Sequence, residues 1–474
     1  MPRKRSSREK TNIEDESVKN KGPTPEEALP AQTINDYRCS GNVQIDFPAL
    51  CAFLDMKNIP TVCITETEDT DDNQSQIKNK YLWCKPRLTV KLETEDPHSA
   101  TKIKISGWKV NEQIFQVLQI MLPSMSQLAS LQFWQTGLTD PMVISLMNTL
   151  SLCSSLRSVT LEGNALPEQS FHLLLSETSV LTHLSLRNNQ IGDEGAHLIG
   201  LALSNTRSAN KNLLSLNLAF NSIGDAGARH VAQGLRFNRT LVFLSLSNNQ
   251  IGDSGAAHLA TVLGEFSLNH EEVKERRKLL LQRTQTSRLG PDPEQLCGEQ
   301  LVLGALKREN KTTPPKKVVS RKDEKSADNK EKSNKKSTDS KVTQSKNQKP
   351  GGKEKQLPTQ EQAELVGIVN PLLDPSVHCR DGQLFFPGNK TLASLNLAGN
   401  RITEKSLLFF LRSLEIQDAE GGLLRLCLQR NHFSSECDSY MKIKELMASR
   451  NNLEPLRSLI KNDPETREQE GQVA

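Results

Sequence analysis

The chain has 474 residues, enough for two or three ordinary domains or for one extended repeat array with disordered segments. Hydrophobic residues make up 35% and the mean hydropathy is -0.52, which excludes a chain that enters a core throughout its length. The net charge of +4 is uneven, because residues 305–355 hold 17 Lys or Arg against 7 Asp or Glu. The basic character is therefore local.

The nine cysteines are scattered and form no C-x-x-C pair, a pattern that argues against a disulfide-capped secreted domain. The first residues are polar, and no apolar run approaches the length of a membrane-spanning helix. We therefore expect an intracellular, cytoplasmic protein, with a cytoskeletal, ciliary or nuclear placement left open.

The N-terminal region divides into two parts by composition. Residues 1–36 are polar and are predicted to be disordered. Residues 37–100 contain short alternating runs that predict strands, among them Arg87-Leu88-Thr89-Val90-Lys91-Leu92. We expect this segment to form a cap over the first repeat of the array that follows.

Residues 101–265 carry an internal repeat of the form L-x-x-L-x-L-x-x-N-x-I/L, as in Leu181-Leu184-Leu186-Asn189-Ile191. Weaker copies precede it near residues 103 and 128. The asparagines are predicted to form a ladder inside successive turns, where their amides satisfy backbone groups. The ladder residues are Asn164, Asn189, Asn221, Asn249, Asn400 and Asn431.

Repeats of about 28 residues leave room for a full helix after each turn. Three copies continue as Ile-Gly-Asp-x-Gly-Ala, followed by apolar residues at helical spacing. Aspartate is a good N-cap, so we expect Asp193, Asp225 and Asp253 to cap the helices that they begin.

The array is interrupted after the Asn249 repeat and resumes in register 151 residues later, at Asn400. We expect residues 266–387 to form an insertion with a charged helix from Asn269 to Thr284 and a disordered, lysine-rich middle. Residues 388–450 then supply the C-terminal repeats and cap, and residues 451–474 a polar tail. One continuous array is favoured over two, because two C-terminal copies are too few to be stable alone.

These motifs resemble those of the leucine-rich-repeat family, in particular its ribonuclease-inhibitor-like subfamily. The resemblance covers about 100–265 and 388–450. It implies an α/β solenoid with a parallel concave sheet and convex helices. The function it implies is a curved, non-catalytic scaffold for protein–protein interaction.

On the concave face, alternate strand residues point away from the helices, and most of them are small and polar. The bulkier or charged ones are the natural anchors for a protein partner. The candidates are Trp134, Glu162, His183, Arg187, Asn217, Phe243 and Arg425.

No phosphate loop, nucleophile elbow or metalloprotease motif is present, so we expect no enzyme, cofactor, metal or small-molecule substrate. Two other functions stay open. A GTPase regulator acting in trans would need a rim arginine such as Arg187, Arg229 or Arg239. The lysine-rich insertion predicts a contact with a polyanion, either a microtubule or a nucleic acid.

Overall fold

The computed structural model describes residues 34–65, 85–204, 211–287, 370–417 and 421–450. Two units separate along the chain. The first comprises the described residues of Met1–Leu268 and Pro375–Ala474, and the second those of Asn269–Asp374. The repeats and both ends of the array lie in the first unit.

The repeat strands form one sheet in the order β1-β2-β3-β4-β5-β6-β7-β8-β12-β13. From β3 onward all neighbours are parallel, and β2 is antiparallel to β3. Within the described residues the strands are β1 (Thr61–Thr65), β2 (Arg87–Leu92), β3 (Ala100–Ser106), β4 (Ser130–Trp134), β5 (Ser158–Glu162), β6 (His183–Ser185), β7 (Ser215–Asn217), β8 (Phe243–Ser245), β12 (Ser394–Asn396) and β13 (Arg425–Cys427).

Strand β8 pairs directly with β12, with Leu244 opposite Leu395. The repeats before and after the insertion therefore belong to one continuous sheet, as predicted. The fold is a leucine-rich-repeat solenoid.

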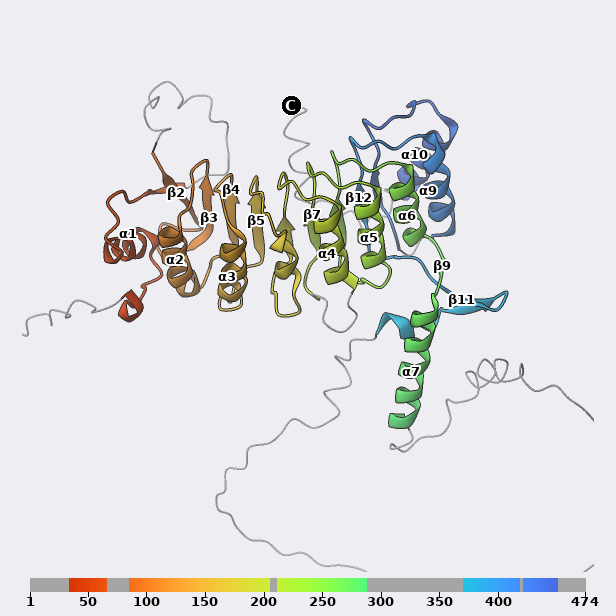
Figure 1. Ribbon diagram of the computed structural model, residues 1–474, viewed down its shortest axis with the longest axis horizontal. Coiled ribbons are helices and arrows are strands. Elements are labelled where there is room, and N and C mark those ends of the chain that lie inside the picture. Colours follow the sequence, from red (N-terminus) through yellow and green to blue (C-terminus); the bar gives the residue numbers. More distant parts are fainter. Residues whose placement is uncertain (1–33, 66–84, 205–210, 288–369, 418–420, 451–474) are drawn as a thin grey trace, which may run out of the picture. The chain divides into compact units, whose positions relative to one another are not determined.

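Helices alternate with the strands and lie along one face of the sheet (Figure 1). They are α2 (Glu112–Met121), α3 (Asp140–Leu150), α4 (Asp193–Ser204), α5 (Asp225–Leu235), α6 (Asp253–Leu263), α9 (Glu404–Ile416) and α10 (Asp438–Arg450), with the 3-10 turn η3 (Leu122–Ser124) after α2. The repeat between Asn164 and Asn189 is the exception. It spans only 25 residues, and a 3-10 helix, η4 (Ser170–Leu175), replaces the α-helix there.

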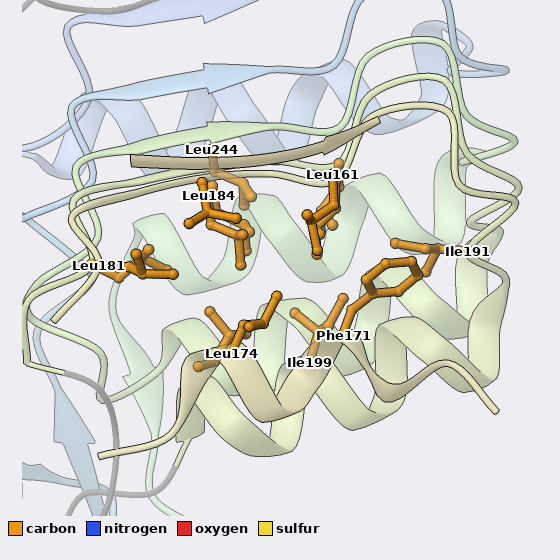
Figure 2. Packing of buried hydrophobic residues seen from close by; sticks show 14 of the residues in the cluster. Leu161, Phe171, Leu174, Leu181, Leu184, Ile191, Ile199 and Leu244 are labelled. Atoms are coloured by element: carbon orange, nitrogen blue, oxygen red, sulfur yellow. The ribbon is translucent and has the colours of Figure 1, made fainter. Parts of the chain in front are cut away.

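The core lies between the sheet and the helices. Leu161, Leu184 and Leu244 point from the strands toward Leu174 and Ile199 on the opposite layer (Figure 2). All five are at least 98% buried. Each fully buried Leu or Ile contributes about 1.5–3 kcal/mol before entropy is subtracted, and one repeat alone cannot bury this edge.

The N-terminal cap contains a helix that the alternating pattern did not predict, α1 (Val43–Phe53), after the short turn η1 (Ile34–Asp36). Asn42 caps it by accepting a bond from the Gln44 amide. The fully buried Asp46 accepts bonds from the Tyr37 hydroxyl, the Ser40 amide and hydroxyl, and the Gly41 amide. Burial and the hydrogen bond to Asp46 raise the pKa of the Tyr37 hydroxyl to about 12. The carboxylate thereby ties the cap's entry loop to its helix.

Both ends of residues 266–387, which the sequence analysis assigns to the insertion, belong to the same unit as the repeats. Strands β9 (Phe266–Ser267), β10 (His378–Arg380) and β11 (Gln383–Phe386) form a small antiparallel sheet in the first unit. Phe266 stacks on Phe386 at 5.5 Å between ring centroids. These aromatic contacts, which the polar composition of the insertion concealed, fix the points where the chain leaves and rejoins the array.

The second unit begins with the expected charged helix, α7 (His270–Ser287). The guanidinium of Arg276 donates to the carbonyl oxygens of Leu372 and Asp374, at the short turn η7 (Pro371–Leu373). The lysine-rich middle of the insertion lies outside the described residues.

Candidate functional site: the open face of the sheet

The asparagine side chains stitch each turn to its neighbours. Asn221 Oδ1 accepts from the amides of Asn189 and Ile191 in the preceding repeat, at 2.9 and 3.0 Å. Its Nδ2 donates to the carbonyl oxygens of Leu186 and Leu218. Asn164, Asn189, Asn249, Asn400 and Asn431 make equivalent inter-repeat bonds. This ladder fixes the turns that border the open face, by which we mean the sheet face turned away from the helices.

The prediction that Asp225 and Asp253 cap their own helices is wrong. The N-cap positions of α5 and α6 are Gly224 and Gly252, and neither helix has a side-chain cap of its own. Asp193 accepts from the Gly224 and Gly227 amides at 2.7 and 2.8 Å, at the start of the next repeat's helix.

The other two acids do the same one repeat further on. Asp225 accepts from the Gly252 and Gly255 amides. Asp253 accepts from the Thr403 amide and hydroxyl and from the Ser406 hydroxyl. Burial works to raise the pKa of Asp253, but these bonds outweigh it and the pKa is lowered. The carboxylates therefore couple repeats and are not a row of reactive acids.

Three of the candidate residues lie in one row at the end of β4 to β6. Trp134 is paired with Glu162 in the strand register and is 46% exposed. Glu162 accepts from the Ser185 hydroxyl at 2.6 Å. Arg187 places its guanidinium carbon 4.4 Å from the ring centroid of Phe220.

The remaining candidates are less accessible. Half-buried His183 has a buried Nδ1 without a hydrogen-bond partner among the described residues, and burial lowers its pKa. Asn217 uses its Oδ1 to accept from the Ala219 amide, and Arg425 is half-buried at the start of β13. Phe243 is buried, so it does not present an exposed anchor.

Phe220 is a site residue that the sequence analysis missed. It occupies the position just before ladder residue Asn221, where the backbone is left-handed at φ 57°. The same turn position also has a positive φ in the other described repeats, where it holds Gln135, Gly163, Asn188, Asn248, Gly399 and Arg430. A bulky residue there is strained, yet the Phe220 ring is 44% exposed and contributes little to the core. A phenylalanine where the two flanking repeats place asparagine was the available signal.

The arginines proposed for a GTPase regulator do not gather on this face. Arg229 lies in α5, and its Nη2 is 3.4 Å from His230 Nε2. Arg239 Nη1 donates to the carbonyl oxygens of Arg236 and Asn238, and its guanidinium lies 5.1 Å from the Phe386 ring centroid. Of the three, Arg187 alone points to the open face.

A search of the parts of the chain that the structure describes gives no group of three or more His, Cys, Asp or Glu suited to a metal ion. Among the same residues, no helix combines the length and apolarity needed to cross a membrane.

Comparison with known proteins supports the fold. The Leucine Rich repeat family model matches residues 179–200, 209–232, 237–260 and 388–411. These segments cover the repeats on both sides of the insertion. Among solved structures, an internalin from Listeria monocytogenes is 11% identical, with 73% of this chain and 84% of that chain covered and a TM-score of 0.16. That TM-score is too low to bear on function.

Proposed function

We propose that the protein is a non-catalytic scaffold that binds a protein partner on the open face over β4 to β7 and along the adjoining turns. Leucine-rich-repeat solenoids generally mediate protein–protein interaction, and four segments of this chain match the model of that repeat, which supports the proposal. The observation that carries the proposal is Phe220, which is held in a strained backbone conformation and exposed to solvent. The other repeats fill this left-handed turn position without a phenylalanine, so neither the turn nor the core needs the exposed ring, which points to a role outside the fold.

The surface around Phe220 has the composition of an interaction site. Trp134 and Phe220 supply exposed aromatic area, and Arg187 stacks on the Phe220 ring. Trp and Arg are enriched among residues that dominate binding energy. Strands lie about 4.8 Å apart, so β4 to β7 span about 14 Å, which matches the 10–12 Å diameter of a partner helix. The small serines and threonines between the anchors allow close approach.

The test is proximity labelling in cells with the full chain and two variants. Phe220→Asn combined with Trp134→Ser removes both aromatic anchors. Leu201→Asn removes an equally exposed apolar side chain from α4 on the helix side. We expect the first variant to lose its specific labelled partners by at least tenfold and the second to retain them. Identical partner profiles for the two variants, with both folded, would contradict the proposal.

A further inference from the structure

The junction between the η4 repeat and the α4 repeat lacks the carboxylate that joins the repeats on either side of it. Before this junction, Asp140 accepts from the Glu168 and Ser170 amides at the start of η4. After it, the aspartates that begin α4, α5 and α6 each accept from the start of the next helix. The η4 repeat has Gln169 in this position, so the start of α4 faces an uncharged amide.

Gln169 occupies the space of that carboxylate without forming its bond. A Cβ added to Gly195 would meet Gln169 Oε1. In the next repeat, a Cβ added to Gly227 would meet Asp193 Oδ1, and that oxygen accepts from the Gly227 amide at 2.8 Å. Gln169 Oε1, by contrast, is buried and has no hydrogen-bond partner among the described residues. A buried acceptor that loses its bond to water without gaining another destabilises the packed state.

The asparagine ladder lacks one of its usual bonds at the same junction. At the other ladder junctions, the asparagine Oδ1 accepts from the amide two residues after the preceding ladder position, as Asn221 does from Ile191 at 3.0 Å. At this junction Asn189 Oδ1 accepts from the Asn164 amide, but the Leu166 amide makes no such bond among the described residues. One connection between the two turns is therefore absent here.

The helix layer is also uneven around α4. On one side, η4 is a 3-10 helix of six residues, and its N-cap Gln169 has a left-handed backbone at φ 54°. On the other side, α5 lies so close that a Cβ on Gly200 would clash with the His230 carbonyl oxygen. The His197 and His230 rings lie across the two helices at 4.1 Å between centroids. Helix α4 is therefore packed closely against α5, whereas its junction with η4 lacks two polar connections.

In a solenoid each repeat contacts only its neighbours, so the array opens most readily at its weakest junction. We infer that the junction between η4 and β6 is a hinge that divides the array into two cooperative blocks. The first block comprises the described residues of 34–175, and the second those of 183–268 and 375–450. Leu161 and Leu184 continue the buried leucine ladder across the hinge, so the blocks separate only in a partly open state.

The hinge crosses the surface of the proposed function. Trp134 and Glu162 belong to the first block, whereas Arg187 and Phe220 belong to the second. Opening therefore changes the spacing between the two exposed aromatic rings. A partner that contacts both rings would hold the blocks together. The hinge itself does not rest on the proposed function, because it is a property of the free chain.

Hydrogen exchange of the full chain at increasing urea concentrations tests the hinge directly. We expect the amides of β3 to β5 to exchange through one opening reaction and those of β6 to β12 through another, with different urea dependences. All three tryptophans of the sequence precede the hinge. The unfolding midpoint of tryptophan fluorescence should therefore agree with exchange in β3 to β5 and differ from exchange in β6 to β12.

Gln169→Glu restores a carboxylate at the hinge. Its oxygen should accept from the Gly195 amide as Asp193 does from Gly227, and thereby join the blocks. We expect the two exchange groups to merge and the less protected block to exchange about tenfold more slowly, the gain from one charge-assisted hydrogen bond. Gln250→Glu is the matched control, because it makes the same change of charge at an exposed turn residue and should leave the groups separate.

A single cooperative exchange group in the wild-type chain would overturn the inference. So would a boundary outside residues 162–183, or a boundary that persists in folded Gln169→Glu. If that variant does not fold, the boundary in the wild-type chain decides alone. Exchange is measured on the free chain, so loss or retention of labelled partners by the Phe220 variant is an independent result.

Discussion

Replacement of Asp225 by alanine tests whether the aspartates that recur at the helix starts hold one repeat to the next. Asp225 Oδ1 accepts from two helix-start amides of the following repeat, Gly252 at 2.7 Å and Gly255 at 2.9 Å. Loss of a capping carboxylate costs about 0.5–2 kcal/mol, and bonds to a charged acceptor lie at the strong end. We expect Asp225→Ala to lower the free energy of unfolding by about 2 kcal/mol, and Asp225→Asn by about half as much because an acceptor oxygen remains.

Measuring where the Asp225→Ala variant loses stability is a sharper test than measuring how much it loses. Hydrogen exchange resolved to single amides should show protection at Gly252 and Gly255 falling by up to about 30-fold, the equivalent of 2 kcal/mol. The first-turn amides of α5 should keep their protection, because Asp193 caps them. Loss of protection at the start of α5, with Gly252 and Gly255 unchanged, would refute the inter-repeat capping.

Three further predictions follow from single side chains. Burial lowers the pKa of His183, so on acidification this side chain is protonated in the unfolded chain at a higher pH than in the folded chain. Folding stability should therefore decline as the pH falls below about 6.5. His183→Asn should flatten this decline in urea titrations between about pH 7 and 5. Gly200→Ala places a Cβ 2.3 Å from the His230 carbonyl oxygen and should destabilise the array by about 1–3 kcal/mol in the same assay, whereas Gly192→Ala, with nothing within 4 Å, should be tolerated. Phe220→Asn should raise the free energy of unfolding by up to about 1 kcal/mol by relieving the left-handed strain, and a loss of stability would contradict that strain.

The repeat period predicted which residues face the helices, because a leucine ladder can be buried only against its neighbours. It also predicted the return of the array at Leu392 and Asn400, since the same spacing recurs on both sides of the gap. The repeat period did not predict that the aspartates bond to the following repeat. An acid at a helix start looks the same in sequence whether it bonds the amides of its own helix or those of the next repeat.

The site was less predictable than the fold for a related reason. Alternation along a strand predicts which face a side chain occupies, and Trp134 and Phe243 both occupy the open face. It does not predict how deeply each side chain is buried, so the exposure of Trp134 and the burial of Phe243 could not be distinguished. Phe220 was overlooked because a lone phenylalanine next to a leucine ladder is normally part of the core. Its left-handed backbone appears only once the turn geometry is known.

The insertion leaves the array unbroken because both of its ends reproduce an ordinary repeat junction. Asn238 Oδ1 accepts from the Thr240 and Leu241 amides, and Asn389 Oδ1 accepts from the Thr391 and Leu392 amides in the same pattern. Asn389 also donates to the carbonyl oxygens of Leu235 and Asn238 in the repeat before the insertion. By the general length dependence of loop closure, a connection of about 150 residues instead of about 28 costs only about 1.5 kcal/mol more. One leucine buried across the β8–β12 junction offsets that cost. The length of the insertion is therefore a small term in the stability of the array.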